Sequence, residues 1–288
     1  MFGVHDFLGG PLRPGDPRRF LIEAMIAARA AAGLDRDGRV ELERLVASQP
    51  LFEGLTPATA HTLVELAADA TRAASGPAAQ AAAIARGLPS RAHRLVAFAL
   101  AGAAVGGDSS PLLEELCLAL RLPADEAEAL LAAAEGDALA TLLPARLARL
   151  RGLVPTVARL FALRAAAREQ LTDDHRFRVA AFFDGIPELA LGQGAVDVAL
   201  FQAFRAVATE APVTFTALGQ LAAGLEEPVD RYWLLVYALA AELPATISRW
   251  RIIPFIGLCQ AAFQVADGDV ELAVADALGF PPALARAE

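Results

Sequence analysis

The sequence predicts an all-α protein. Apolar residues make up 56% of the 288 residues, and much of this fraction is Ala and Leu, which cost least to hold in a helix. Aromatic residues make up only 7%, and segments that alternate apolar and polar residues, as half-buried strands do, are hard to find. Two helical domains fit comfortably in a chain of this length.

A short acidic string recurs along the chain and predicts a duplicated helical bundle. It begins at Asp37-Gly38, Asp184-Gly185 and Asp267-Gly268, and a weaker relative lies at Gly107-Asp108. Each copy separates two apolar stretches, so we expect a corner in which glycine turns the backbone and the acidic side chain faces a new helix N-terminus. Two corners in each half predict two tandem bundles.

The first half divides into helices at its prolines and capping residues. Residues 1–16, rich in Gly and Pro, are expected to form a flexible arm. Asp16-Pro17 begins the first helix, which Gly33 closes. The Asp35–Glu41 corner leads into a second helix that Pro50 stops. Further helices are expected from Thr56-Pro57, over 77–86, over 92–105 until Gly106-Gly107, over 111–120 after Ser110, and from Pro123.

The second half repeats this organisation less regularly. Helices over 138–150 and 156–170 are expected to connect the halves, with the boundary within Leu143–Pro155. The predicted domains are therefore residues 17–150 and 151–288. The remaining predicted helices cover 177–183, 196–207, 214–221, 230–243, 252–266 and 271–278.

Three strings of the first half carry a resemblance: AMIAARAAAGLDRDGRVELERL, QPLFEGLTPA, and LPSRAHRLVAFALAGAAVGGDSSPLLEELCLALRLP. With these strings, residues 17–135 resemble a TerB-like domain, the helical module named for tellurite-resistance proteins, and residues 170–288 resemble a divergent second copy. The resemblance implies a helical bundle and an association with metal or oxidant stress. It also implies divalent-cation binding through acidic corner residues in some members, and it implies no reaction.

The candidate cation ligands are five carboxylates of the first half: Asp35, Asp37, Glu41, Asp108 and Glu114. Calcium or magnesium needs several converging oxygens, which these side chains would supply if the two corners pack at one end of the bundle. The alternative is that they only complement helix N-termini, which stabilises by about 0.3–1 kcal/mol without a metal. An EF-hand does not fit, because Gly38 in its sixth place would put Gly33 first and Arg44 twelfth.

Aromatic and arginine residues gather in the second half, and Arg231, Trp233 and Trp250 are the candidate partner-binding residues. Large aromatic residues at helical spacing are usually part of a core. The alternative is a groove between the two halves of the chain that binds a protein partner, since Trp and Arg are enriched at interfaces.

Composition excludes several other functions. The net charge of −9 argues against a nucleic-acid surface. Four scattered histidines and two isolated cysteines give no zinc spacing, and no nucleophile elbow or phosphate loop occurs, so no enzyme activity is expected. We also expect no secretory signal, no membrane span and a reducing cytoplasm, with peripheral membrane contact left open. The leading hypothesis is a non-catalytic, cation-binding stress protein, and the alternative is a helical interaction scaffold.

Overall fold

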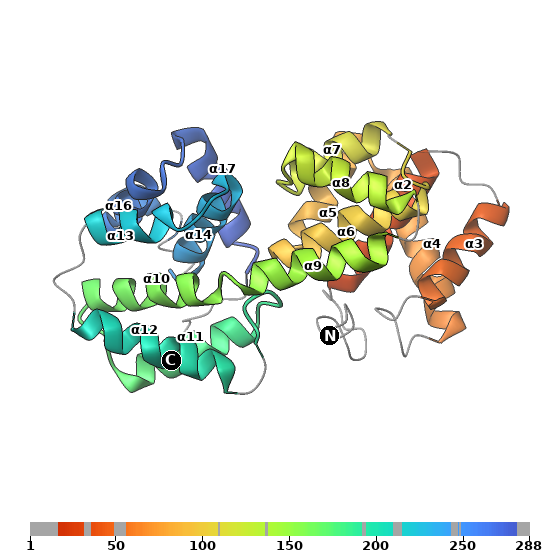
Figure 1. Cartoon of the computed structure of the whole chain (residues 1–288). Coiled ribbons are helices and arrows are strands. Elements are labelled where there is room, and N and C mark those ends of the chain that lie inside the picture. The colour runs from red at the N-terminus through yellow and green to blue at the C-terminus, as the bar shows by residue number, and fades with distance from the viewer. Residues whose placement is uncertain are drawn as a thin grey trace. The chain divides into compact units, whose positions relative to one another are not determined.

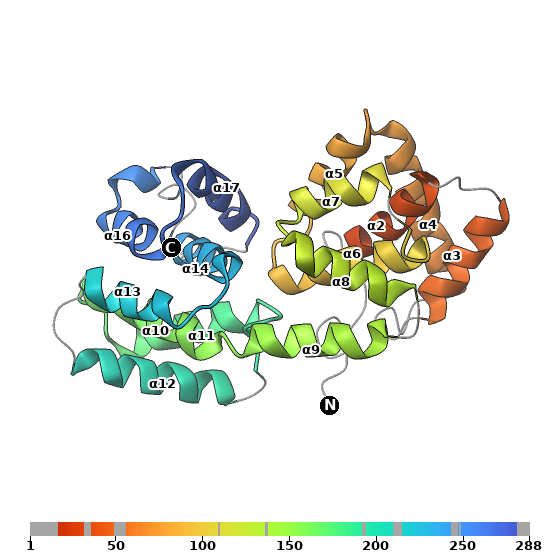
Figure 2. The same cartoon turned by 45° about the horizontal axis from the view of Figure 1, so that its top comes forward.

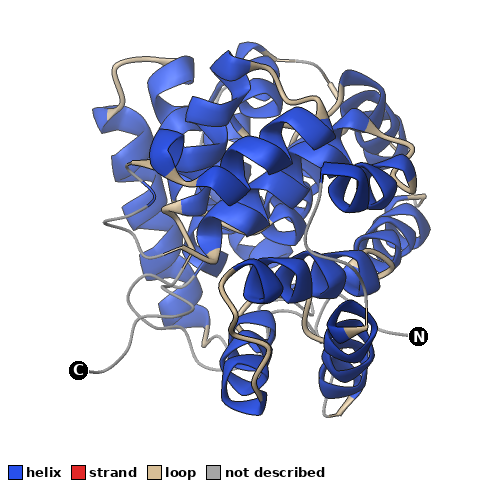
Figure 3. Cartoon of the chain, turned by 90° about the vertical axis from the view of Figure 1, so that its left-hand side faces the viewer, coloured by secondary structure: helices blue, strands red, loops and turns tan. Residues whose placement is uncertain are grey.

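The computed structural model describes residues 17–31, 36–48, 56–108, 110–135, 138–191, 194–209, 215–242, 247 and 249–280. These residues are helical or lie in turns and loops, and they include no strand, which confirms the predicted all-α class (Figure 3). The expected N-terminal arm over 1–16 and the predicted bend at 49–55 lie outside the described residues.

The chain divides into two compact units, Met1–Ala148 and Arg149–Glu288, close to the predicted boundary at 150/151 (Figure 1). The first unit contains α2 (Pro17–Ala31), α3 (Arg36–Ser48), α4 (Pro57–Ala73), α5 (Pro77–Arg86), α6 (Arg91–Ala104), α7 (Pro111–Ala119), α8 (Ala124–Ala134) and most of α9 (Leu139–Arg151). The second contains α10 (Val154–Ala167), α11 (Asp173–Asp184), α12 (Ala195–Ala208), α13 (Phe215–Ala223), α14 (Pro228–Ala240), the short 3₁₀ helix η2 (Trp250–Ile252), α16 (Pro254–Phe263) and α17 (Asp267–Ala277).

The two units share an order of helix pairing. In the first unit α2 packs on α4 and α6, α3 on α4, α5 on α7, and α6 on α8. In the second unit α10 packs on α12 and α14, α11 on α12, α13 on α16, and α14 on α17 (Figure 2). Each pairing of the first list has its counterpart at the same place in the second. The expected duplication of one helical bundle stays a prediction.

Four helix starts have a local cause that is visible in the sequence. The hydroxyl oxygens of Thr56, Ser90, Ser110 and Thr172 each accept a hydrogen bond from the backbone N–H three residues further on. These bonds satisfy donors that the first turn of a helix leaves without a partner. Proline follows Thr56 and Ser110, where its missing N–H costs no helical bond. The predicted starts of α4, α6 and α7 are thereby confirmed.

The acidic strings are not equivalent corners, which corrects the sequence prediction. Asp37-Gly38 lies inside the first turn of α3, and Asp267-Gly268 begins α17. Asp184, in contrast, is the last residue of α11. Among the described glycines, positive φ occurs at Gly76, Gly106, Gly107 and Gly194 and at none of the three Asp-Gly strings. Glycine therefore turns the backbone only at the weaker Gly107-Asp108 relative.

The boundary between the units lies within a helix rather than in a loop. Pro144 lies inside α9, which continues to Arg151. Near the end of α9, Arg149 Nη2 lies 2.6 Å from Asp230 Oδ2 and 2.9 Å from Glu227 Oε1, at the start of α14. Arg149 already belongs to the second unit, so these ion pairs lie within that unit.

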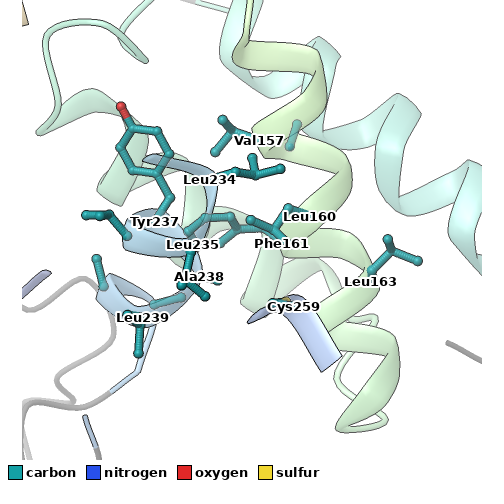
Figure 4. Close-up of a cluster of buried hydrophobic side chains, with 14 of the residues drawn as sticks. Val157, Leu160, Phe161, Leu163, Leu234, Leu235, Tyr237, Ala238, Leu239 and Cys259 are labelled. Carbon is teal, nitrogen blue, oxygen red and sulfur yellow. The ribbon is translucent and has the colours of Figure 1, made fainter. Parts of the chain in front are cut away.

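A cluster of buried apolar side chains lies where α10 meets α14 in the second unit. Apolar side chains from both helices interleave around Phe161 and Leu235, and the thiol of Cys259 reaches the same cluster from α16 (Figure 4). All three side chains are buried. Since burial of apolar area is the main force that favours folding, this cluster fixes where the neighbouring helices must lie.

Candidate functional site

The structure places three of the five predicted cation ligands. Asp37 is exposed in the first turn of α3, Asp108 is exposed after α6, and Glu114 is exposed in the first turn of α7. Asp35 lies outside the described residues. Glu41 lies in α3, but its side chain is also outside what the structure describes.

The described carboxylates do not form a metal centre by themselves. Among the side chains that the structure places, no three His, Cys, Asp or Glu residues come together in a group able to hold a metal ion. The proposed ligand set therefore depends on Asp35 and Glu41. Cation binding remains a prediction, as does the alternative that Asp37 and Glu114 only complement the positive ends of α3 and α7.

Polar contacts that sequence reasoning missed join α3 to α4. His61 Nδ1 lies 2.7 Å from Glu43 Oε1, and Arg39 Nη1 donates to Glu65 Oε1 at 3.0 Å. The hydrogen bond to the Glu43 carboxylate, followed by its charge, raises the pKa of the His61 imidazole. The Glu43 carboxylate is thus engaged with an imidazole.

The predicted partner-binding residues have separate surroundings. Trp233 is only 1% exposed and belongs to the core of the second unit, so its assignment to a partner surface is corrected. Arg231 is half-buried, and its Nη2 donates to the carbonyl of Leu225 at 3.3 Å. Trp250 is also half-buried, in η2. Of the three, only Trp250 belongs to a surface with further exposed apolar residues.

We call Trp250, Arg251, Ile252 and Leu258 the η2 surface. Ile252 is 74% exposed, and Leu258 on α16 is exposed as well. The Arg251 guanidinium lies 4.7 Å from the centre of the Trp250 ring, and its Nη2 donates to Glu271 Oε1 of α17 at 2.9 Å. A cation over an indole face contributes about 0.5–1 kcal/mol at an exposed site. Arg251 thereby holds the indole in place beside an isoleucine that faces water.

A second exposed apolar surface was not predicted. Phe177 on α11 and Phe201 on α12 are exposed, and the Arg176 guanidinium lies 5.2 Å from the centre of each ring. A signal in the sequence could have indicated it: Phe177 falls out of step with the buried stripe of α11 at Val179, Phe182 and Phe183.

Buried charges of the second unit form a structural cluster. Arg164 Nε donates to Glu242 Oε1 at 2.8 Å, and Arg168 Nη2 donates to Glu242 Oε2 at 2.6 Å. Burial lowers the pKa of Arg164, while Glu242 opposes that shift.

Burial strongly raises the pKa of the Cys259 thiol, so this thiol stays protonated and unreactive at neutral pH. His175, buried at the start of α11, has a lowered pKa for the same reason, and Arg178, Arg164 and Arg168 add to the shift.

Comparison with known proteins gives no relative: no family model, no curated protein and no solved structure matches this chain. The TerB-like resemblance therefore remains a prediction from the residues quoted above. None of the described helices combines the length and the apolar character that crossing a membrane requires.

Proposed function

We propose that this chain is a non-catalytic helical protein that binds a protein partner through the η2 surface. The observation that carries the proposal is Ile252, which is 74% exposed beside the Trp250 indole that Arg251 covers. Trp and Arg are the side chains that most often dominate the energy of protein interfaces. Leaving a large aliphatic side chain in water has no benefit for folding, because burying it would stabilise the unit.

The neighbouring face of α16 extends this surface without charge. The exposed residues of this helix are Pro254, Gly257, Leu258 and Ala261, and Gln264 is exposed just past the helix end. A Cβ added at Gly257 would meet no atom within 4 Å, so no contact inside the unit requires glycine there. Glycine in a helix interior costs about 0.5–1 kcal/mol relative to alanine. A partner that approaches the backbone closely would explain this cost.

The chemistry of the described residues supports a non-catalytic role. The Cys259 thiol is buried and protonated, and the His175 imidazole is buried among arginines that disfavour its charged form. Neither is poised as a nucleophile or a general base. Cys117 and Cys259 are both free, which fits the proposed reducing cytoplasm.

Affinity capture from the source cells tests the interaction. We expect Trp250→Ala and Ile252→Ser to lower recovery of the partner by more than about tenfold, because both remove a central contact. Leu118→Ser is the matched control, since Leu118 is a strongly exposed aliphatic residue, at 66%, on α7 of the other unit. Equal recovery with all three variants would contradict the proposal.

A further inference from the structure

The surface formed by α11 and α12 is a second place where apolar side chains face water. We call Arg176, Phe177, Val198 and Phe201 the α11–α12 patch. Phe177 is 58% exposed and Phe201 is 50% exposed, and Val198 is exposed one helical turn before Phe201. The two helices pack on each other, so the phenylalanines come from adjacent elements of one unit (Figures 1 and 2).

Arg176 organises the two rings. Its guanidinium lies 5.2 Å from the centre of both Phe177 and Phe201, and its side chain is only 17% exposed. Both rings therefore lie against the same cation. A surface whose side chains are already held in place loses less conformational entropy when a partner binds.

The carboxylates beside the rings reach water more than the two arginines that pair with them. Asp173, which lies 3.3 Å from Arg176, is 81% exposed, and so is Asp174, which pairs with Arg178 at 2.9 Å. Asp197, next to Val198, is exposed as well. Arg178 is less exposed than its partner, and Arg205 is the exposed basic residue on the same side of α12. The patch thus presents apolar anchors beside carboxylates, in a chain of net charge −9.

We propose that the α11–α12 patch binds a cationic amphipathic helix of a protein partner. Apolar side chains of such a helix would cover Phe177 and Phe201, and its Lys or Arg residues would face Asp173, Asp174 and Asp197. A second copy of this chain fits less well, because it would bring like carboxylates together. An anionic bilayer would be repelled for the same reason. This inference concerns a different surface from η2 and does not depend on it.

The first unit offers an internal comparison. Its corresponding helix pair, α3 and α4, exposes the aliphatic residues Val40 and Leu66. There Arg39 pairs with Glu65 at 3.0 Å instead of lying against aromatic rings. The first unit therefore has an exposed helix pair without the aromatic anchors, and Leu66→Ala is a matched control for the patch.

Fluorescence anisotropy with synthetic peptides on the full chain tests the proposal. The probe is a labelled helix-forming peptide of roughly 15 residues with leucines on one face and lysines beside them, and its control carries glutamate in place of lysine. We expect the lysine peptide to bind and the glutamate peptide to bind at least tenfold more weakly. Phe201→Ala, or Asp173→Asn with Asp174→Asn, should weaken binding of the lysine peptide about tenfold, whereas Leu66→Ala and Phe201→Leu should retain it.

Three results would overturn the proposal. The first is no binding, or equal binding of both peptides. The second is concentration-dependent dimerisation in sedimentation that Phe201→Ala abolishes, which would assign the patch to a second copy. The third is binding to phosphatidylserine vesicles that the same substitution removes, which would assign it to a membrane. Helix content by circular dichroism establishes that each variant is folded, since the substituted side chains are exposed.

Discussion

At the scale of single residues, the acidic side chains of the first unit have two competing explanations. Asp37 lies in the first turn of α3, where a negative charge is favoured by the helix dipole. A cation site would need further oxygens close to it, and the described carboxylates do not supply a group of three. The choice between a helix-end charge and a ligand therefore depends on Asp35 and Glu41.

Calorimetric titration decides between these explanations. If the carboxylates hold a cation, calcium or magnesium will release heat on binding to the wild type, and Asp37→Asn will weaken that binding, because one charged ligand is lost. If Asp37 is only a helix-end charge, both proteins will give flat traces. In that case Asp37→Asn will lower the free energy of unfolding by about 0.3–1 kcal/mol.

The lowered pKa of His175 predicts how the stability of the second unit depends on pH. Burial and three arginines lower the pKa of this imidazole below its ordinary value of 6.5. At a pH between the folded and the unfolded pKa of His175, the unfolded chain binds the proton and the folded chain does not. Stability is therefore lost as the pH falls below about 6.5, the unfolded value. The loss is no more than about 1.4 kcal/mol per pH unit.

Urea unfolding followed by tryptophan fluorescence at several pH values checks this expectation. His175→Gln should lose less stability than the wild type between neutral and mildly acidic pH. The contribution of His61 to the pH dependence of stability has the opposite sign. Its raised pKa adds stability at low pH, and this stability is lost as the pH rises through the folded pKa. Both tryptophans lie in the second unit, so their fluorescence reports on His175 rather than on His61. Identical pH profiles of stability for the wild type and His175→Gln would contradict the assignment of this pH dependence to His175.

At the scale of elements, the ion pairs of Glu242 join α10 to the end of α14. The Glu242 carboxylate is buried and accepts from Arg164 and Arg168. Glu242→Leu should lower the free energy of unfolding by about 3–5 kcal/mol, because it leaves the buried Arg164 cation without its counter-charge. The double variant Arg164→Met, Glu242→Leu should recover most of that loss. Urea unfolding measures both, and a double variant as unstable as the single one would show that the charge is not the cause.

Helix starts were predictable because their causes are local. Ser90 and Ser110 cap α6 and α7 through bonds to residues three positions away, and the side chain and its partner are both visible in the sequence. The role of the Asp-Gly strings was not predictable in the same way. Asp184 ends α11 while Asp37 and Asp267 begin helices, because the packing of the flanking apolar residues decides on which side of the string a helix forms.

At the scale of the whole molecule, each unit has a buried core of its own, which predicts separate unfolding. Leu95 is fully buried in α6 of the first unit. Leu95→Ala should lower the stability of that unit by about 2–5 kcal/mol, through lost burial and the cavity that remains. Circular dichroism should then show an earlier partial transition, while the midpoint from tryptophan fluorescence stays unchanged. A parallel shift of both midpoints would show that the units unfold together.

The sequence by itself determined the fold class, the positions of most helices and the approximate division into two units. Composition, capping residues and apolar spacing act over a few residues, so they can be recognised without a structure. Tertiary packing alone decided which of the large apolar side chains are buried and which are exposed. Trp233 and Trp250 are alike in sequence terms, yet one is buried and the other borders an exposed isoleucine, because burial depends on which helices meet around each side chain. For the same reason, only the structure shows that Arg176 lies against both Phe177 and Phe201, residues that belong to two different helices.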